Sequence, residues 1–487
     1  MSLTRKVAFN TIFQIAGKVI VTAISLVVVA LLTRYLGVSG YGDYTTVFTY
    51  VSFWAILADF GFFWVLVREI SKSATNQEEI FNNIITLKSI FGVVVFILCS
   101  LLGFLIPQYS WTVKLGIAII SASWFWMSLN STYVGLFQSK LEMYKAVIAE
   151  VLGRAAILIG VLFLIKINTS LYGILWVYIF GNLLNFLISL YFGSKYVKFR
   201  FTYNLKIWKY VLKESLPLVI LNFIGLIHFR IDTIILSVMK GSLDVGIYGV
   251  PSKILEIVIL IPGIFMGNVF PILTNYYHSK DKRLSEAIQK SFDFLTIIAM
   301  PVLVGLIVLS WPLVDFIAGK EYLNTSTINF LGLDFSAPRI LTILAISIFA
   351  SFFLTIFSNL LTVMEKQSKQ VLPIIVITVV NIILNIILIP RYSYLAAAMV
   401  NVFTGTVMLV WWNHLTHKYL DYKLNYKIFP KVIFATLIMG AVLYASRSMN
   451  VLIAIILGII VYFAVGYFIK IFDKEMLSKI IALRKEG

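Results

Sequence analysis

The sequence predicts an all-α polytopic membrane protein with about 14 transmembrane helices. Of its 487 residues, 60% are hydrophobic and only 13% are charged, and the mean hydropathy is +0.95. Apolar runs of about 20 residues, the length that crosses a bilayer as a helix, recur throughout the chain. These runs do not alternate apolar and polar residues, as the strands of a membrane barrel would.

The apolar runs define fourteen candidate spans, and an even number places both chain ends on one side of the membrane. Of the 40 Lys and Arg residues, 28 fall on the side of the N-terminus, 8 on the opposite side and 4 within spans. Because basic loops stay in the cytoplasm, we expect a multi-pass cell membrane protein with both termini cytoplasmic. The spans lie near residues 12–33, 44–67, 84–106, 113–137, 146–166, 170–192, 215–239, 246–270, 291–314, 338–361, 371–389, 394–413, 430–446 and 451–471.

The same topology accounts for most of the formal net charge of +18. Basic and aromatic residues are concentrated in the stretch 193–214, between spans six and seven, which is typical of a segment on a membrane surface. Nucleic acid is not expected as a partner. Cys99 is the one cysteine, which excludes a disulfide framework, and the chain carries no nucleotide-binding glycine loop or metal-binding histidine group. We therefore expect no catalytic residues, cofactor or metal.

The two halves of the chain contain an internal repeat. The pattern G-x-x-x-x-G-x-Y begins at Gly37, at the end of the first span, and again at Gly241, at the end of the seventh, 204 residues later. Repeats of this kind are typical of transporters with two lobes around a central cavity. We expect an N-terminal lobe with six spans, a basic cytoplasmic linker, a C-terminal lobe with six spans, and two further spans with a cytoplasmic tail. These parts comprise residues 1–192, 193–214, 215–417 and 418–487.

Ionisable residues inside two adjacent spans are the main anomaly of the sequence. Arg230 and Asp232 lie in span seven, and Lys253 and Glu256 lie in span eight. A charge at a bilayer centre costs at least about 2.5–3.5 kcal/mol, so such groups usually face a bundle interior or a wet cavity. The four residues form either the lining of a polar pathway or two local ion pairs that hold helices together.

Several segments resemble the polysaccharide-export flippases of the Wzx type, which share a superfamily with MurJ lipid II flippases and MATE multidrug exporters. The resemblance covers most of residues 1–420, with its segments in the expected order. The matching segments are L-L-T-R-Y-L-G-V-S-G-Y-G-D-Y (31–44), L-A-D-F-G (57–61), V-R-E-I (67–70), R-I-D-T-I-I-L (230–236), V-G-I-Y (245–248) and N-I-I-L-N-I-I-L-I-P (381–390).

The resemblance implies a fold of two six-helix lobes in a MATE-like V, here with two additional C-terminal helices. It also implies a polyprenyl-diphosphate-linked oligosaccharide as cargo, moved from the cytoplasmic to the outer leaflet by alternating access for polysaccharide or glycoprotein glycan assembly. The chain is then a transporter that works among membrane lipids, and not an enzyme. The alternative is a MATE-like cation-coupled multidrug antiporter, for which an acidic cavity would be expected.

The family's cavities are cationic, which suits a diphosphate. The candidate substrate-binding cations are Lys18, Arg154, Arg230 and Lys253. Each has a structural alternative. Lys18 is close enough to the inner end of its helix to extend its ammonium to the interface. Arg154 follows Glu150 by four residues, and Lys253 precedes Glu256 by three, so both can form pairs along one helix.

Three carboxylates are candidates for coupling to H+ or Na+ or for pairing between the lobes: Asp59, Asp232 and Glu256. Asp59 lies within span two, where a buried carboxylate either binds a cation or pairs with a basic group such as Lys18 or Arg230. Asp232 is only two residues from Arg230 and therefore points to another face of the helix.

Overall fold

The computed structural model describes residues 3–72 and 76–471, and the side chains of this part except those of residues 3–8, 218 and 221. The predicted cytoplasmic tail at 472–487 lies outside the described residues. The chain divides into two compact units, Met1–Gly249 and Val250–Gly487. The lobes predicted from the internal repeat, residues 1–192 and 215–417, stay a prediction.

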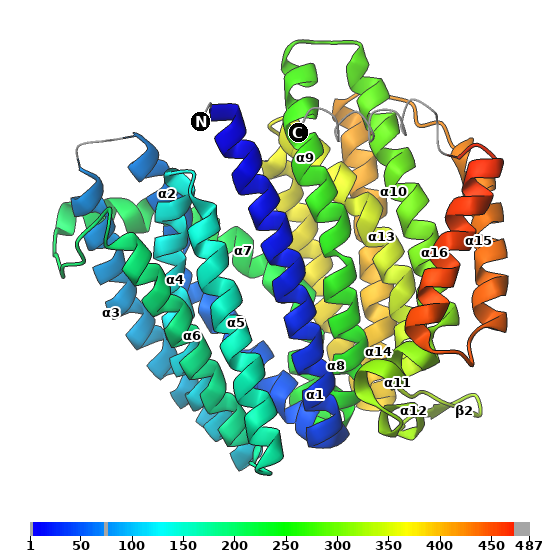
Figure 1. The fold of residues 1–487 in the computed structure, drawn as a ribbon, viewed down its shortest axis with the longest axis horizontal. Helices are drawn as coiled ribbons and strands as arrows, with labels where there is room; N and C mark the ends of the chain where they lie inside the picture. Colours follow the sequence, from blue (N-terminus) through cyan, green and yellow to red (C-terminus); the bar gives the residue numbers. More distant parts are fainter. Residues whose placement is uncertain (1–2, 73–75, 472–487) are drawn as a thin grey trace. The chain divides into compact units, whose positions relative to one another are not determined.

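The first unit is a bundle of α-helices (Figure 1). Its helices are α1 (Leu3–Asp59), α2 (Phe62–Lys72), α3 (Gln77–Phe104), α4 (Trp111–Ser139), α5 (Met143–Lys166), α6 (Leu171–Gly193), α7 (Leu205–Met239) and the beginning of α8 (Ser242–Val258).

The prediction of an all-α protein with about fourteen spans is confirmed. In the described part of the chain, 12 helical stretches are long and apolar enough to cross a membrane. Two of these, Phe9–Lys72 and Gln367–Tyr419, are long enough to contain two predicted spans each. At both predicted junctions one residue interrupts the helix where the sequence suggests a short turn. These residues are Gly37, with φ 67°, and Ser393, with φ 44°.

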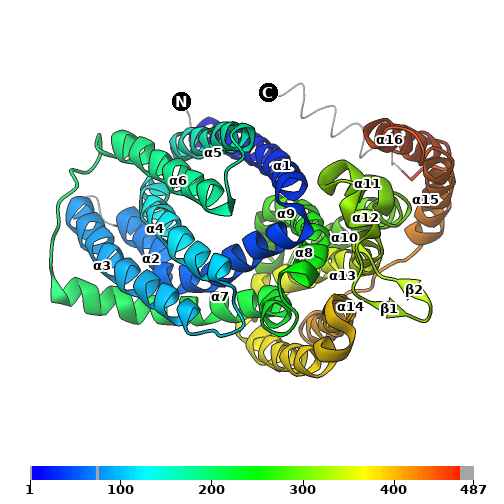
Figure 2. The same cartoon turned by 90° about the horizontal axis from the view of Figure 1, so that it is seen from below.

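Helix α4 is central to the packing of the first unit. It contacts α3 and α6, between which it lies in the end-on view of Figure 2, and α1 packs against α4 and α5. A buried cluster near one end of α4 includes Phe62 and Leu66 from α2, Phe81 from α3, and Leu136 and Phe137 from α4. The apolar residues recur along each helix so that they form one face, and these faces pack against each other. Few polar groups therefore lie inside the bundle.

A reciprocal backbone contact joins the two copies of the repeated motif. A Cβ atom on Gly42 would lie 1.7 Å from the carbonyl oxygen of Ser242, and one on Gly246 would lie 1.9 Å from the carbonyl oxygen of Val38. Each glycine thus contacts the backbone four residues before its counterpart. Only glycine allows two helices to approach so closely. The repeat found in the sequence is therefore also a repeat in the packing.

The described part of the second unit comprises the remainder of α8, eight further α-helices, one 3-10 helix and one short hairpin (Figure 1). The elements are α9 (Leu260–His278), α10 (Arg283–Val308), α11 (Ser310–Ala318), α12 (Glu321–Asn324), β1 (Asn329–Phe330), β2 (Leu333–Asp334), α13 (Ala337–Val363), the 3-10 helix η1 (Gln367–Gln370), α14 (Val371–Tyr419), α15 (Ile428–Ala445) and α16 (Val451–Phe468).

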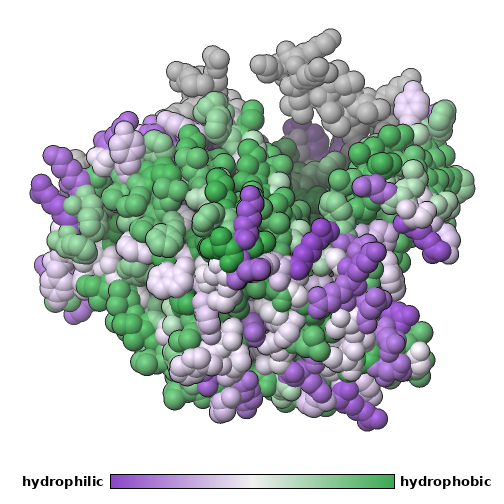
Figure 3. Space-filling model, turned by 60° about the horizontal axis from the view of Figure 1, so that its bottom comes forward, coloured by the Kyte–Doolittle hydropathy of each residue, from purple (hydrophilic) through white to green (hydrophobic). Residues whose placement is uncertain are grey.

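Helix α13 forms the core of this unit, in contact with α9, α10 and α14, while α15 packs against α10 and α16. The antiparallel strands β1 and β2 pair Asn329 with Asp334. Large hydrophobic side chains remain exposed along many helices, as expected where lipid replaces water. Figure 3 shows broad hydrophobic surfaces on the flanks and hydrophilic side chains gathered on the end that is turned forward.

The glycine contact yields a stability prediction. Gly42→Ala should lower the free energy of unfolding by about 1–3 kcal/mol, because the new methyl group collides with a backbone carbonyl that cannot move aside. The measurement is the thermal unfolding midpoint of the purified protein in detergent. Gly225→Ala, in α7 of the same unit, is the matched control because an added Cβ there meets nothing within 4 Å. An unchanged midpoint for Gly42→Ala would show that the contact does not hold the helices together.

Candidate transport site

An ion pair between a buried lysine and a half-buried aspartate lies where α1 ends, within the predicted second span. Lys88 of α3 donates hydrogen bonds to Asp59 and to Ser131 of α4, and the Ser131 hydroxyl donates to the same Asp59 oxygen at 3.0 Å. The Lys88 side chain is 1% exposed, and that of Asp59 is 33% exposed. The chain leaves the α-helix here through Phe60, with φ 46°, and Gly61, with φ 75°, before α2 begins. Asp59 is thus the last residue of α1 before the break.

The partner of Asp59 was not predicted. We expected Asp59 to bind a cation or to pair with Lys18 or Arg230, and the structure pairs it with Lys88. The charge count assigned Lys88 to the cytoplasmic side, although it lies about 16 Å along α3 from the first residue of that helix. The sequence does indicate a membrane position for Lys88, because this residue falls inside the predicted span 84–106. Its removal from the cytoplasmic count does not reverse the charge asymmetry.

The predicted cations of the first unit lie in different surroundings. Lys18 is exposed on α1. Arg154 is half-buried on α5 and interacts electrostatically with Tyr44 and Tyr178, whose hydroxyls are hydrogen-bonded to each other at 2.8 Å. Among the ion pairs of the described residues, none joins Arg154 to Glu150. The groups with which Arg154 interacts are therefore polar and uncharged tyrosines, and not the carboxylate of Glu150.

Arg230 and Asp232 occupy separate faces of α7, as their spacing predicts. Arg230 is half-buried, whereas Asp232 is only 4% exposed. Asp232 accepts a hydrogen bond from the hydroxyl of Tyr248 in α8 and one of 2.7 Å from the backbone N–H of Thr233. Asp232 thus joins α7 to α8. Tyr248 is the repeat counterpart of Tyr44. Both tyrosine hydroxyls are hydrogen-bonded inside the first unit, that of Tyr248 to Asp232 and that of Tyr44 to the hydroxyl of Tyr178.

In the second unit, Lys253 and Glu256 form the local ion pair that their spacing suggested, with Nζ and Oε2 2.8 Å apart. Both side chains keep partial exposure, at 36% and 20%. The pair lies along one face of α8, so the charge of Lys253 is largely offset by its neighbour. Lys253 and Glu256 therefore present a dipole at this position rather than two separate charges.

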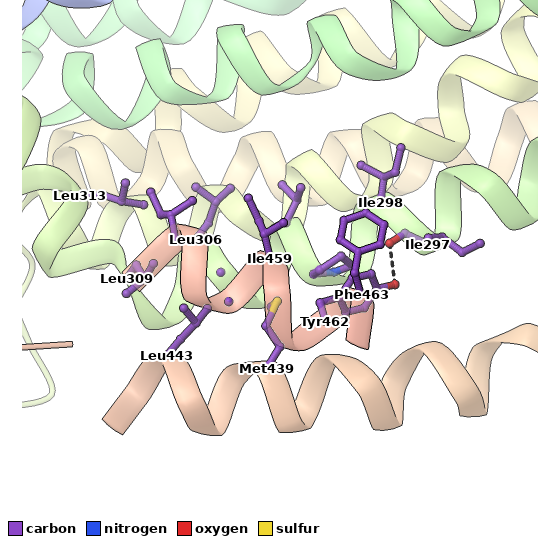
Figure 4. Close-up of a pocket in the computed structure, with 15 residues that line it drawn as sticks. Ile297, Ile298, Leu306, Leu309, Leu313, Met439, Leu443, Ile459, Tyr462 and Phe463 are labelled. Atoms are coloured by element: carbon purple, nitrogen blue, oxygen red, sulfur yellow. Dashed lines mark hydrogen bonds between the residues drawn. The ribbon is translucent and has the colours of Figure 1, made fainter. Parts of the chain in front are cut away.

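An apolar cavity of about 360 Å³ lies between α10, α15 and α16 (Figure 4). Side chains from all three helices converge on it, including Leu306, Met439 and Ile459, and the hydroxyl of Tyr462 is turned away to donate to the carbonyl of Ile297 at 2.7 Å. Its lining consists of hydrocarbon groups, so it suits an apolar chain. The sequence did not distinguish between such a groove and plain packing for the last two spans.

The Lys88–Asp59 pair yields a second stability prediction. Asp59→Asn should lower the free energy of unfolding by about 3–5 kcal/mol, because it leaves a fully buried ammonium without a counter-charge. Lys88→Met should cost less, since the remaining carboxylate is partly exposed. The double variant Asp59→Asn/Lys88→Met should be more stable than Asp59→Asn alone. Thermal unfolding of all three proteins in detergent measures this, and a double variant no better than Asp59→Asn would contradict a direct interaction.

The sequence and the fold were compared with those of known proteins. The profile of the family described as polysaccharide biosynthesis protein matches residues 7–277, and that of the MatE family matches residues 217–387. No curated protein sequence matches the chain.

The fold is similar to several solved structures. The lipid II flippase MurJ, in an inward closed conformation, has 17% identity and a TM-score of 0.75, over 94% of this chain and 99% of that one. An inward-facing multidrug resistance MATE family transporter of the MOP superfamily has 15% identity and a TM-score of 0.65, over 82% and 95% of the chains. A MOP superfamily transporter from Pyrococcus furiosus, described by a binding pocket of reverse polarity, has 15% identity and a TM-score of 0.57, over 85% and 96%.

These likenesses confirm the predicted fold, and the family match covers more than half of the sequence. The chain therefore belongs to the polysaccharide biosynthesis protein family, and its fold is that of the MurJ and MATE structures.

Proposed function

We propose that this protein is a flippase that moves a polyprenyl-diphosphate-linked oligosaccharide from the cytoplasmic to the outer leaflet of the cell membrane. It does so by alternating access, and its product feeds polysaccharide or glycoprotein glycan assembly. The observation that carries the proposal is the hydrocarbon-lined cavity between α10, α15 and α16, in a chain of a polysaccharide biosynthesis family. A transporter of a free, water-soluble sugar has no use for such a cavity.

The proposed substrate has three chemically different parts, and we assign protein groups to each part. The polyprenyl tail is apolar and fits the hydrocarbon cavity. The diphosphate requires cations, for which Arg230, Arg154, Lys18 and Lys253 are the candidates, with Lys253 weakened by its pairing with Glu256. Arginine binds phosphate through paired N–H groups, so Arg230 and Arg154 are the stronger candidates. The sugar hydroxyls suit tyrosine and asparagine side chains.

The orientation and the energy source are part of the proposal. The excess of basic residues on the side of the N-terminus supports cytoplasmic termini. Asp59, Asp232 and Glu256 are the candidates for coupling to H+ or Na+. Each has a structural role in its own unit, through Lys88, Tyr248 and Lys253 respectively. A coupling carboxylate has to release such a partner when it binds its cation.

A second candidate function is cation-coupled export of drugs. The MatE profile match over residues 217–387 favours it. Cationic drugs need carboxylates that are free to receive them, whereas the described carboxylates Asp59 and Glu256 already pair with lysines. The two functions differ in what accumulates when the protein is lost, which makes them separable in one strain.

The proposal predicts a lipid phenotype. A strain that lacks the protein should accumulate a polyprenyl-diphosphate oligosaccharide in the cytoplasmic leaflet, and expression of Arg230→Ala should leave this accumulation in place, although the variant reaches the membrane normally. The measurement is mass spectrometry of carrier lipids, with the two leaflets separated by an impermeant label. Arg391→Ala is the control, because Arg391 is exposed and lies against the ring of Tyr392.

Two outcomes would contradict this assignment. Unchanged carrier lipids together with a new sensitivity to cationic drugs would favour the antiporter. Full rescue by Arg230→Ala would remove Arg230 from substrate binding and leave Arg154 as the remaining arginine candidate.

The apolar cavity yields a separate prediction. Gly305→Leu should slow transport of the long-chain carrier several-fold while leaving the fold intact, because Gly305 lines the cavity and an added Cβ meets nothing within 4 Å. Gly305→Ala is the matched control and should transport normally. The measurement is the initial rate of translocation in vesicles with a long and a short prenyl chain. Equal slowing of both chains would show that the cavity does not bind the distal part of the tail.

A further inference from the structure

The segment that joins α6 to α7 is fastened along the end of α3. The buried Asn82 side chain donates to the carbonyl of Lys198 at 3.0 Å and accepts from the N–H of Arg200 at 3.1 Å. One turn further along α3, Thr86 accepts from the N–H of Thr202 at 3.1 Å. Alternate residues of this extended segment are thereby tied to α3 through their backbone, and the residues between them face away.

The residues that alternate with the tied positions, at 199, 201 and 203, are all aromatic. Phe199, Phe201 and Tyr203 are 39%, 73% and 66% exposed, and we refer to these three side chains as the aromatic row. The rings of Phe199 and Phe201 are 4.9 Å apart, and Tyr203 contacts Trp208 at 4.8 Å between ring centroids. Three neighbouring exposed rings on a segment that is hydrogen-bonded to α3 form an apolar surface of the kind that marks a membrane or partner contact.

The same stretch carries an uncompensated positive charge. Residues 193–213 contain six basic side chains and no acidic one, and all six are exposed. None of the six forms an ion pair with an acidic residue in the part of the chain that the structure describes. The six residues are Lys195, Lys198, Arg200, Lys206, Lys209 and Lys213.

The aromatic row lies at the edge of a lipid-facing surface. Asn82 and Thr86 belong to the stripe of α3 that continues through Ile90, Val93 and Ile97, which are 52%, 46% and 54% exposed. Positions 86 and 90 are one helical turn apart, about 6 Å. The fastened segment therefore lies where the apolar flank of α3 ends, which is the depth of phospholipid headgroups. Aromatic side chains prefer that depth, and basic side chains there attract anionic lipids.

We propose that residues 195–213 form a binding site for anionic phospholipid, in which the aromatic row enters the headgroup region beside α3 and the basic residues contact lipid phosphates. The occupant is a lipid rather than a protein because the site continues an already lipid-exposed helix face. The first turns of α7 are held in place by the Arg68–Glu214 ion pair of 2.8 Å and by a hydrogen bond of 2.9 Å from Tyr210 to Glu69. The site is thus built before a lipid arrives.

The inference rests on the membrane location and not on the transported substrate, so lipid binding and export can fail independently. The test uses the full-length protein in detergent, titrated with phosphatidylglycerol or phosphatidylcholine, with bound lipids counted by native mass spectrometry. The variant is Lys195→Gln/Lys198→Gln/Lys206→Gln/Lys209→Gln. Its affinity for phosphatidylglycerol should fall by about fivefold for each residue that contacts a phosphate, while phosphatidylcholine binding is unchanged.

A matched control removes the same charge elsewhere. Lys418→Gln/Lys423→Gln/Lys427→Gln/Lys431→Gln neutralises four exposed lysines on the predicted cytoplasmic side of the second unit and should bind phosphatidylglycerol like the wild type. If both variants lost the same affinity for phosphatidylglycerol, overall surface charge would explain the effect, and the proposal would be overturned. Unchanged binding in the first variant would also overturn it.

The depth of the aromatic row provides a second, independent measurement. Cys99 is buried and should not be labelled, so a spin label on Phe201→Cys reports on one position in the otherwise native chain. In vesicles that contain phosphatidylglycerol, the label should be accessible to oxygen and shielded from a water-soluble nickel complex. A label on Lys282→Cys, outside the spans, should show the reverse. A fully water-accessible label at position 201 would contradict insertion of the aromatic row and favour a protein partner for this surface.

Discussion

The structure depends on how a largely apolar chain accommodates charges inside its spans. A bilayer offers no solvent to an ionised side chain, so each such group needs a partner fixed by the fold. In the first unit, Lys88 and Asp59 meet this requirement together with Ser131, at the point where α1 breaks and α2 begins. The two charges and the serine come from three helices, α1, α3 and α4, so the ion pair also specifies how those helices pack.

The other ionisable groups are accommodated in ways that differ in their consequences for transport. Asp232 is held by a tyrosine hydroxyl and a backbone N–H, which stabilise a carboxylate without cancelling its charge. Lys253 and Glu256 largely cancel each other. Arg154 interacts electrostatically with Tyr44 and Tyr178 and forms no ion pair with Glu150.

Much of the fold could be predicted from the sequence, because apolar runs and basic loops are visible in the local amino-acid composition. The fourteen spans needed only segment length, and the Gly37 and Gly241 echo located the repeated motif. Both glycines have positive φ, at 67° and 94°, which explains why this residue type recurs there. The Lys253–Glu256 pair was also within reach, because both members are on one helix. The partner of Asp59 was not, since Lys88 is 29 residues away on another helix and only the packing of α1, α3 and α4 brings them together. The cavity beside α15 and α16 is equally a product of tertiary packing.

The reciprocal contact of Gly42 with Ser242, and of Gly246 with Val38, has a consequence for biosynthesis. The two motifs are separated by 204 residues, so the first is already in the membrane long before the second has been made. At typical synthesis rates this interval is roughly 10–40 s. During that time the glycine surface of α1 is exposed to lipid or to the translocation machinery, without its eventual partner. A surface of backbone and glycine has few side-chain atoms with which to form a non-native contact. The glycines that permit the close approach therefore also limit mispacking of α1 before its partner has been made.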